Sequence, residues 1–229
     1  MKAILKIHVC TYICTETKKD NKMKRIIILT AVALATASSS VLAKKTPEKT
    51  TATEASAWKT DASHSSVKFT VSHLTVSEVE GKFKVFDGSI TAPSGDFNNA
   101  KINFSVDVNS VNTDDDNRDK HLKSEDFFNA EKFPAMTFTS TSFKKMKGDI
   151  YYLEGNLTIR DVTKKVKFAV LYGGTVKDPW GNIKTGFKAT SKISRKEYGL
   201  KWNKLTEAGG AVVGDEVSIA LNLEFAKQK

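Results

Sequence analysis

The chain has 229 residues, of which 36 are Lys or Arg and 26 are Asp or Glu, giving a formal net charge of +10. Both cysteines, Cys10 and Cys14, precede residue 43, so the chain beyond that point has no disulfide, zinc–thiolate site or thiol nucleophile. Residues 1–43 also hold seven basic and two acidic side chains, which leaves 29 basic and 24 acidic residues in 44–229. The resulting net charge of +5 is ordinary for a soluble surface.

Residues 23–43 have the layout of a cleavable signal peptide. A basic start at Met23-Lys24-Arg25 precedes an apolar run of twelve residues, 26–37, and small residues follow up to Ala43. The apolar run is shorter than the roughly 20 residues that span a bilayer. We therefore expect export to the periplasm or secretion, initiation at Met23, and an upstream extension at 1–22. Residue 44 is Lys, so no cysteine follows the cleavage site to carry a lipid anchor.

The polar stretch 44–57 lacks bulky apolar residues, which predicts a flexible linker. From Trp58 to Phe225 the dominant pattern is alternation of apolar and polar residues, typical of half-buried strands. The apolar members are Val67, Phe69 and Val71; Val79, Gly81, Phe83 and Val85; Ile102, Phe104, Val106 and Val108; Met136 and Phe138; Val166, Phe168 and Val170; Phe187, Ala189, Ser191 and Ile193; and Val217, Ile219, Leu221, Leu223 and Phe225.

Turn-forming residues separate these runs, and one segment interrupts the pattern. We expect turns at Asp87-Gly88, 93–96, 147–149, Gly173-Gly174 and 179–182. Residues 113–134 instead predict a short helical insert capped by Thr113 or Asp114, with a second helical turn near 124–128.

About eight strands, each apolar on one face, need one shared core. A sandwich and a closed barrel both satisfy this, and a barrel also removes exposed strand edges. The predicted fold is all-β with minor α: an antiparallel barrel of about eight strands over 58–225. An eight-stranded barrel has room for its own side chains or for one small ligand.

The histidines and acidic residues give no recognised metal or catalytic motif. None of His64, His73 and His121 has a second histidine at i+2 or i+4, and we expect no metal site. The run Asp114–Asp116 has contiguous acids where a calcium loop alternates them, and helix capping explains it. Nucleophile-elbow and phosphate-loop motifs are also missing from the sequence, so we predict no catalytic residue.

Two further groups of residues can each be interpreted in two ways. Arg118, Asp119 and His121 either contact a ligand head group at the barrel mouth or hold the helical insert through internal bonds. Lys82-Phe83-Lys84 resembles a single-stranded nucleic-acid surface, but alternation sends lysine and phenylalanine to opposite faces. We therefore expect no nucleic-acid partner.

Five motifs in the same order resemble the YceI-like, polyisoprenoid-binding family. They are HSSVKFTVSHL at 64–74, NRDKHLKSEDFF at 117–128, GNLTI at 155–159, SRKEYGL at 194–200 and VGDEV at 213–217. The resemblance covers Trp58 to Phe225. It implies an extended lipocalin-like barrel with no cofactor, whose interior binds an isoprenoid, a quinone-like molecule or a fatty amide, and it supplies no catalytic residues.

The residues that would contact such a ligand are our own prediction. They are bulky members of the inward-facing sets and of the insert: Phe69, Val71, Phe83, Phe104, Val106, Phe127, Phe128, Phe138, Phe168, Phe187, Ile219 and Leu221. An apolar lining offers dispersion and dehydration, which suits a long hydrocarbon chain.

Three alternatives remain open at this point. The first is an outer-membrane barrel, which would place apolar residues outward and lysines in the lumen. The second is a small hydrolase that uses His121 with Asp119. The third is an exported structural or stress-related scaffold with a solid core. A homodimer is also left open.

Overall fold

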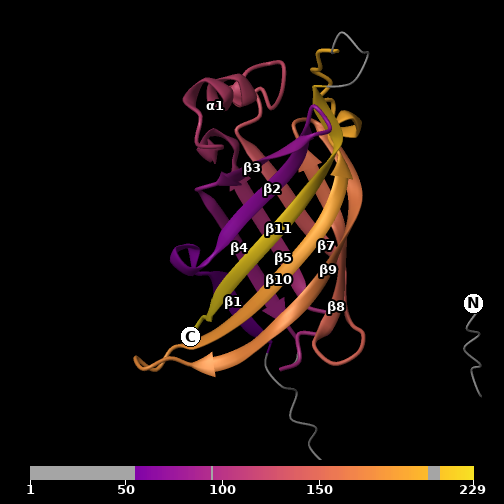
Figure 1. The fold of residues 1–229 in the computed structure, drawn as a ribbon. Coiled ribbons are helices and arrows are strands. Elements are labelled where there is room, and N and C mark those ends of the chain that lie inside the picture. Colours follow the sequence, from indigo (N-terminus) through magenta and orange to yellow (C-terminus); the bar gives the residue numbers. More distant parts are fainter. Residues whose placement is uncertain (1–54, 94, 206–211) are drawn as a thin grey trace, which may run out of the picture. The chain divides into compact units, whose positions relative to one another are not determined.

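The apolar–polar alternation folds into strands that close into a ring (Figure 1). This computed structural model describes residues 55–93, 95–205 and 212–229. The strands are β1 (Ser56–Thr60), β2 (Ser66–His73), β3 (Ser77–Phe83), β4 (Phe86–Ala92), β5 (Lys101–Asp107), β6 (Val111–Asn112), β7 (Ala135–Lys145), β8 (Ile150–Ile159), β9 (Val162–Lys177), β10 (Ile183–Ser194) and β11 (Val213–Lys227). The helix α1 spans Asp116–Lys123, and short 3₁₀ turns lie at Ala62–His64, Val108–Ser110 and Lys196–Tyr198.

The ring contains eight strands, and all of its pairings are antiparallel. The order is β1, β4, β5, β7, β8, β9, β10 and β11, and β11 pairs back with β1. β2 pairs with β11 beyond the end of β1, and β3 and β6 follow it in the wall near α1. The predicted antiparallel barrel of about eight strands is confirmed.

Two expected turns are wrong because they lie inside strands. Asp87-Gly88 belongs to β4, where Gly88 pairs with Phe104 of β5. Gly173-Gly174 belongs to β9, beside a register shift in the pairing with β10 that falls between Gly186 and Phe187. The glycines at these positions accommodate close packing and strand irregularity rather than reversing the chain.

Val85 was also expected to face the core but is 56% exposed. The chain leaves β3 after Phe83 and enters β4 at Phe86, so the two strands are out of phase. Phe83 and Phe86 both pack on the core across this break. A two-residue interruption therefore reverses the parity on which the expectation rested.

The helical insert forms where predicted, but its cap differs. Asp115 is the N-cap of α1, and its Oδ1 accepts a hydrogen bond of 2.9 Å from the Arg118 N–H. Asp114 instead has a left-handed backbone, with φ of 58°, and Thr113 is buried. Residues 124–128 form turns rather than a second helix. The N-cap is therefore the residue whose carboxylate reaches the free N–H groups of the first helical turn, and that residue is Asp115.

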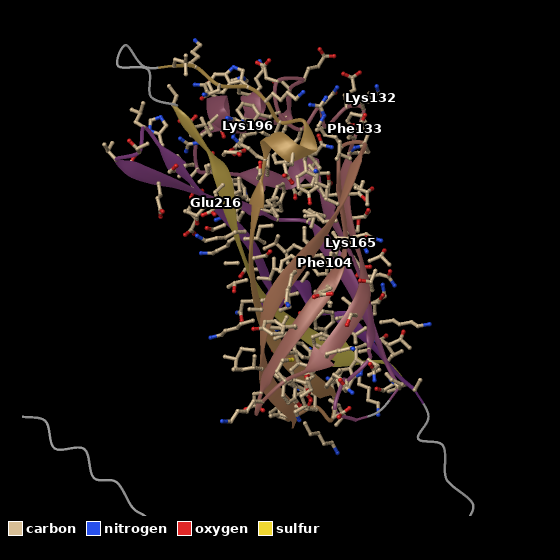
Figure 2. All side chains as sticks on the ribbon, turned by 90° about the vertical axis from the view of Figure 1, so that its right-hand side faces the viewer. Phe104, Lys132, Phe133, Lys165, Lys196 and Glu216 are labelled. Atoms are coloured by element: carbon tan, nitrogen blue, oxygen red, sulfur yellow. The ribbon has the colours of Figure 1, made fainter. Side chains whose placement is uncertain are left out.

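The strands face their apolar side chains inward. In adjacent strands Phe69 is paired with Ile219 and Phe187 with Leu223, so the inward positions form continuous rows around the ring. Figure 2 shows Lys165 of β9 on the outside of the barrel. This orientation is the reverse of the one that the outer-membrane alternative requires.

The predicted signal at 23–43, the extension at 1–22 and most of the linker lie outside the described residues. β1 begins at Ser56, two residues before Trp58, the expected start of the domain. Within the described part of the chain, no helix combines the length and apolar character needed to cross a bilayer.

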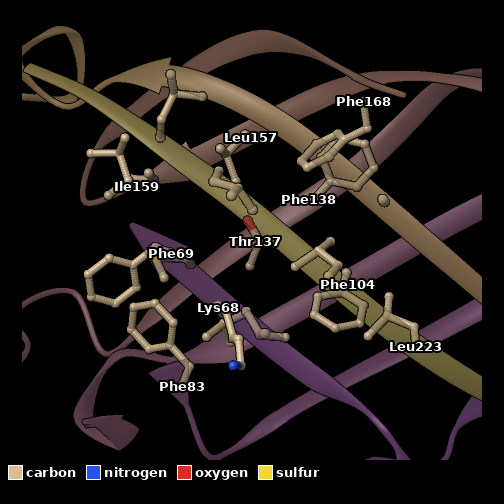
Figure 3. A pocket seen from close by; sticks show the side chains of 18 of the residues that line it. Lys68, Phe69, Phe83, Phe104, Thr137, Phe138, Leu157, Ile159, Phe168 and Leu223 are labelled. Atoms are coloured by element: carbon tan, nitrogen blue, oxygen red, sulfur yellow. The ribbon is translucent and has the colours of Figure 1, made fainter. Parts of the chain in front are cut away.

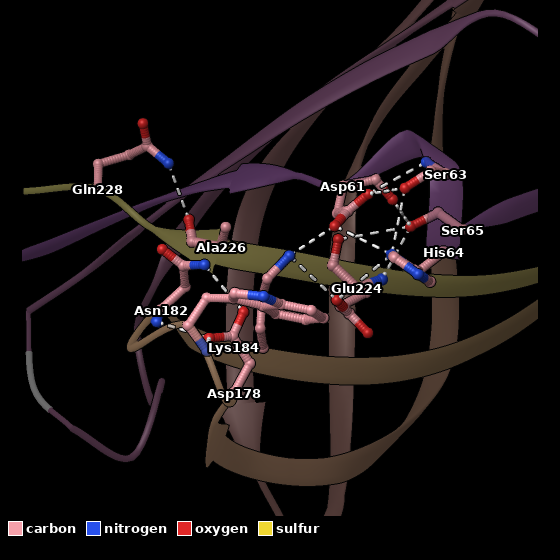
Figure 4. Close-up of polar contacts among 11 residues, drawn as sticks. Asp61, Ser63, His64, Ser65, Asp178, Asn182, Lys184, Glu224, Ala226 and Gln228 are labelled. Carbon is pink, nitrogen blue, oxygen red and sulfur yellow. Dashed lines mark hydrogen bonds and ion pairs between the residues drawn. The ribbon is translucent and has the colours of Figure 1, made fainter.

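An ion-pair cluster joins β10 and β11 at the break between β1 and β2 (Figure 4). The Lys184 ammonium lies 2.5 Å from Asp61 Oδ2 and 3.2 Å from Glu224 Oε1, and His64 Nδ1 lies 3.1 Å from Asp61 Oδ2. The hydrogen bond from Lys184, followed by that from Ser63, holds the pKa of Asp61 well below its usual range. Asp61, His64 and Glu224 could also serve as metal ligands, but Lys184 already supplies a positive charge between the two carboxylates.

This cluster predicts an acid-dependent loss of stability. Because the folded-state pKa of Asp61 is depressed, its stabilisation is present above the unfolded value of 3.8 and disappears as the pH falls further. Asp61→Asn should lower the free energy of unfolding by about 1.5–3 kcal/mol at pH 7, since hydrogen bonds to charged groups contribute that much. The deficit relative to the wild type should shrink as the pH falls below about 4. Urea titrations across the acid and neutral range measure both quantities.

Asp87→Asn is the matched control. Asp87 pairs with Lys59 at 2.8 Å, but the two side chains are 67% and 52% exposed. Exposed pairs contribute little. An Asp61→Asn variant that loses no more stability than Asp87→Asn contradicts the proposed role of the cluster.

Candidate functional site

The barrel encloses an apolar cavity of about 210 Å³ (Figure 3). All of the residues predicted to contact a ligand line it, from the phenylalanines of the barrel wall to Phe127 and Phe128 of the insert. They are Phe69, Val71, Phe83, Phe104, Val106, Phe127, Phe128, Phe138, Phe168, Phe187, Ile219 and Leu221. The inward convergence expected from the alternation is therefore present, while contact with a ligand stays a prediction.

The lining also includes residues that were not selected. Many are apolar members of the same inward rows, which the alternation already identifies: Val67, Ile102, Met136, Val170, Ala189, Ile193, Val217, Leu223 and Phe225. Ile90, Leu122, Phe143, Leu153, Leu157, Ile159, Leu200 and Val213 complete the apolar set. The polar lining residues Lys68, Thr137 and Arg195 were not predicted from the sequence, and the position of Arg195 depends on where the chain turns after β10.

Phenylalanine rings lie against glycines of the neighbouring strand. The ring of Phe69 covers Gly81, its register partner, and the ring of Phe104 covers Gly88 in the same way. The Phe138 ring lies over Gly155. A side chain at any of these glycines would meet the ring, so glycine lets the ring lie flat on the wall and leaves space along the barrel axis.

Aromatic side chains close the end of the barrel opposite α1. Phe97, in the β4–β5 connection, is almost fully buried and its ring centroid lies 5.2 Å from those of Trp58 and Phe187. Tyr172 packs on the same ring at 5.8 Å. Because Phe187 lines the cavity and Phe97 lies behind it, the cavity ends at this cluster.

The insert covers the other end, and Arg118 and Asp119 hold it in place. The buried Asp119 carboxylate accepts hydrogen bonds from the Thr113 N–H at 2.8 Å and from the Thr113 hydroxyl at 2.6 Å. Arg118 donates from Nε to Thr113 Oγ1 and from Nη2 to the Thr113 carbonyl, both at 2.8 Å. These two side chains are thus engaged with the start of the insert.

His121 has a different environment from the one the hydrolase alternative assumes. Its Nε2 lies 2.8 Å from Asp126, not Asp119, and its ring packs edge-on against Phe127 and Trp202 at 5.0 and 4.9 Å. Phe127 and Trp202 are themselves 5.3 Å apart. The histidine therefore joins the insert to the segment after β10, above the cavity lining.

Arg195 is a buried charged residue in this mostly apolar lining, which also includes Lys68 and Thr137. It is 4% exposed, and its guanidinium donates to backbone carbonyls of the segments 200–202 and 213–214. Burial lowers its pKa, partly offset by Asp215. Arginine stays protonated even so, and its charge lies within the wall, because the surface that lines the cavity is almost wholly apolar.

The size of the cavity limits what it holds without rearrangement. A protein cavity of about 150 Å³ accepts a benzene molecule. The present one therefore has room for a ring or a short hydrocarbon segment. A longer chain requires the lining rings to change rotamer or the chain to extend past the insert.

Comparison with known proteins places this barrel among described domains. Residues 58–225 match the family model described as the YceI-like domain. The protein YceI of Salmonella newport strain SL254 is 40% identical over 169 residues, which cover 74% of this chain and 85% of the relative.

Solved structures share the same architecture. The YceI protein of Campylobacter jejuni is 28% identical, with a TM-score of 0.59, and the match covers 69% of this chain and 90% of that one. BcnA of Burkholderia cenocepacia is 22% identical with a TM-score of 0.63, covering 72% and 98%. A polyisoprenoid binding domain from Saccharophagus degradans is 18% identical with a TM-score of 0.55, covering 75% and 98%. The last two matches demonstrate the fold.

The phenylalanine–glycine contacts predict that alanine substitutions at Gly81 and Gly155 have different effects. At Gly81 the three atoms nearest to a new Cβ all belong to the Phe69 ring, which can rotate into the cavity, whereas at Gly155 they include the Thr139 carbonyl of the backbone. Gly155→Ala should therefore lose about 1–3 kcal/mol of unfolding free energy, as overpacking does, and Gly81→Ala should lose less. Gly81→Ala should in turn weaken benzene uptake, measured by NMR titration.

The double variant Gly81→Ala with Phe69→Leu is the control for this mechanism. Removing the ring should restore benzene uptake even though the Gly81→Ala substitution is still present. Unchanged uptake in Gly81→Ala, or no recovery in the double variant, contradicts the idea that the glycine keeps the ring on the wall.

Proposed function

The chain belongs to the YceI-like domain family, and on this basis we propose that it is an exported binding protein that holds a long-chain apolar molecule inside its barrel. Isoprenoids, quinone-like molecules and fatty amides are the ligand classes considered. The observation that carries the proposal is the apolar cavity, whose wall converges on an open volume of about 210 Å³. A binding protein needs such a volume, whereas an exported scaffold would be more stable with it packed.

The energetics favour chains of some length. Each buried methylene contributes about 0.8 kcal/mol, so a five-carbon isoprene unit gives roughly 3–4 kcal/mol before costs. Association costs on the order of 4–15 kcal/mol. One unit therefore does not bind measurably, and affinity should rise with added units until the cavity is occupied. Further carbons then add less binding free energy, because they remain near the insert or outside the cavity.

Two other observations support the proposal. The basic start, apolar run and small-residue end at 23–43 support export, because they have the layout of a secretory signal peptide. The Saccharophagus degradans neighbour is described as a polyisoprenoid binding domain, and at 18% identity it shares the fold of this chain. We extend its ligand class to this chain as part of the proposal.

A hydrolase is less well supported. Its assumed pair does not form, since Asp119 bonds to Thr113 and His121 to Asp126. We accordingly propose a binding role without turnover.

Native mass spectrometry of the exported protein tests the proposal directly. The full chain, expressed with its own leader and purified from the periplasm without detergent, should retain an adduct with the mass of a long-chain lipid. After delipidation it should take up added prenols of increasing length with increasing affinity. Absence of an adduct together with no uptake of any prenol contradicts the carrier function.

A matched pair of substitutions locates the binding. Ala189 lines the cavity from β10, whereas Ala169 on β9 is exposed on the outer face of the barrel. Ala189→Trp places an indole in the cavity and should lower prenol affinity at least about tenfold, because several methylenes lose their space. Ala169→Trp should leave it unchanged. Equal affinities in the two variants would argue against the cavity as the site.

A further inference from the structure

The end of the barrel opposite α1, here called the closed end, carries large apolar side chains in contact with solvent. Two hairpins reach this end, β7–β8 and β9–β10 (Figure 1). Trp180, in the β9–β10 turn, is 84% exposed, and the other exposed apolar residues of these hairpin ends are Met146, Ile150, Leu171 and Val176. Ile150 and Leu171 are register partners in β8 and β9. Single exposed apolar residues are ordinary, but a group of them at one end of a protein marks an interaction site.

The turn that presents Trp180 is held by its own hydrogen bonds. The Asp178 carboxylate accepts bonds from the Trp180 N–H at 3.0 Å, the Asn182 N–H at 2.8 Å and the Asn182 side-chain amide at 2.9 Å. The bonds from Asn182 lower the pKa of Asp178, so this acceptor is charged at neutral pH. The Gly181 N–H donates to the Asp178 carbonyl at 3.0 Å, with Gly181 in a left-handed conformation that favours glycine. The indole therefore stands in solvent on an ordered turn, which loses little freedom on contact with a partner.

Lysines accompany these apolar side chains. β11 also ends at the closed end, because Ala226 pairs with Lys184 near the start of β10. Six lysines lie at the ends of β7, β9 and β11 and in the turns beside them: Lys144, Lys145, Lys147, Lys177, Lys227 and Lys229. Within the described ranges, none of the six forms an ion pair with a carboxylate. Residues 144–150, 176–182 and 226–229 hold two acidic side chains, Asp149 and Asp178, so the closed end has an excess of positive charge.

The insert at the other end of the barrel has the opposite balance. Residues 113–134 contain seven Asp or Glu and four Lys or Arg. A negatively charged surface therefore attracts the closed end and repels the insert, and this difference orients the barrel before contact.

We propose that the closed end docks this protein on the surface of a bilayer that contains anionic lipid. Trp180 enters the head-group boundary, which is the region of a membrane that tryptophan prefers. The lysines lie over the lipid phosphates, where each basic side chain strengthens binding roughly fivefold. This contact is peripheral and does not depend on what the cavity holds. It leaves the α1 end, with the insert over the cavity, facing the aqueous phase.

A bilayer suits these residues better than a second copy of the chain or an acidic protein. Symmetric pairing of two closed ends would bring the lysines of one copy against the same lysines of the other. A stable protein interface also needs a continuous patch of about 800 Å² on each partner. The exposed side chains instead lie on separate hairpins, and Leu171 and Val176 are about 16 Å apart along β9. A fluid surface accommodates separate tips without a matching shape.

Co-sedimentation with two kinds of vesicle tests the docking. The full chain, exported and purified without detergent, is mixed with vesicles of phosphatidylcholine alone or of phosphatidylcholine with an equal part of phosphatidylglycerol. Binding to the anionic vesicles should be at least about tenfold tighter and should weaken as sodium chloride is added, because salt screens the lysines. Equal binding to both vesicles, or binding to neither, overturns the docking and leaves the carrier function untouched.

Two double variants of equal charge assign the contact to the closed end. Lys147→Gln with Lys177→Gln should weaken binding to the anionic vesicles at least about tenfold, since each lysine contributes roughly fivefold. Lys120→Gln with Lys165→Gln removes two exposed lysines from α1 and from the outer wall of β9, and should keep the wild-type affinity. Equal losses in the two double variants contradict the assignment.

An apolar pair of variants tests the indole in the same way. Trp180→Ser should also weaken vesicle binding, whereas Val85→Ser, at a residue that is 56% exposed between β3 and β4, should not. Circular dichroism establishes that each variant is folded. Size-exclusion chromatography without vesicles supplies the last control. Self-association that Trp180→Ser abolishes, together with no vesicle binding, assigns the closed end to a second copy and overturns the proposal.

Discussion

Closure of the sheet is the constraint on which the other features of this molecule depend. Once β11 pairs back with β1, every inward side chain of eight strands points toward one axis. The interior of such a barrel is only just wide enough for side chains or a small ligand. Which of the two occurs depends on how the large inward residues lie. Here they lie along the wall, so the axis stays open.

The flat rings depend on strand register. Phe69 and Gly81, and Phe104 and Gly88, are direct partners in neighbouring strands. Pairing the largest inward side chain with the smallest keeps the wall dense while the axis remains empty. Dispersion contacts between ring and backbone thus replace contacts across the lumen. The same wall that stabilises the fold provides the surface for a hydrocarbon chain.

The two ends of the barrel differ in chemistry, and this gives the cavity a direction. Phe97 and its aromatic neighbours make one end dry and closed. At the other end Arg195 brings a buried charge into the lining, and the insert covers it through Arg118 and Asp119.

The sequence by itself determined the strands, their inward faces and the predicted ligand contacts that line the cavity, because alternation with a period of two is a local property. Tertiary structure decided what depends on neighbours distant in sequence. The break at 84–85 exposed Val85, and the contact with Phe104 placed Asp87-Gly88 inside β4. The role of Arg195 was decided in the same way, since its carbonyl partners lie up to 19 residues away and converge only when β11 returns to the ring.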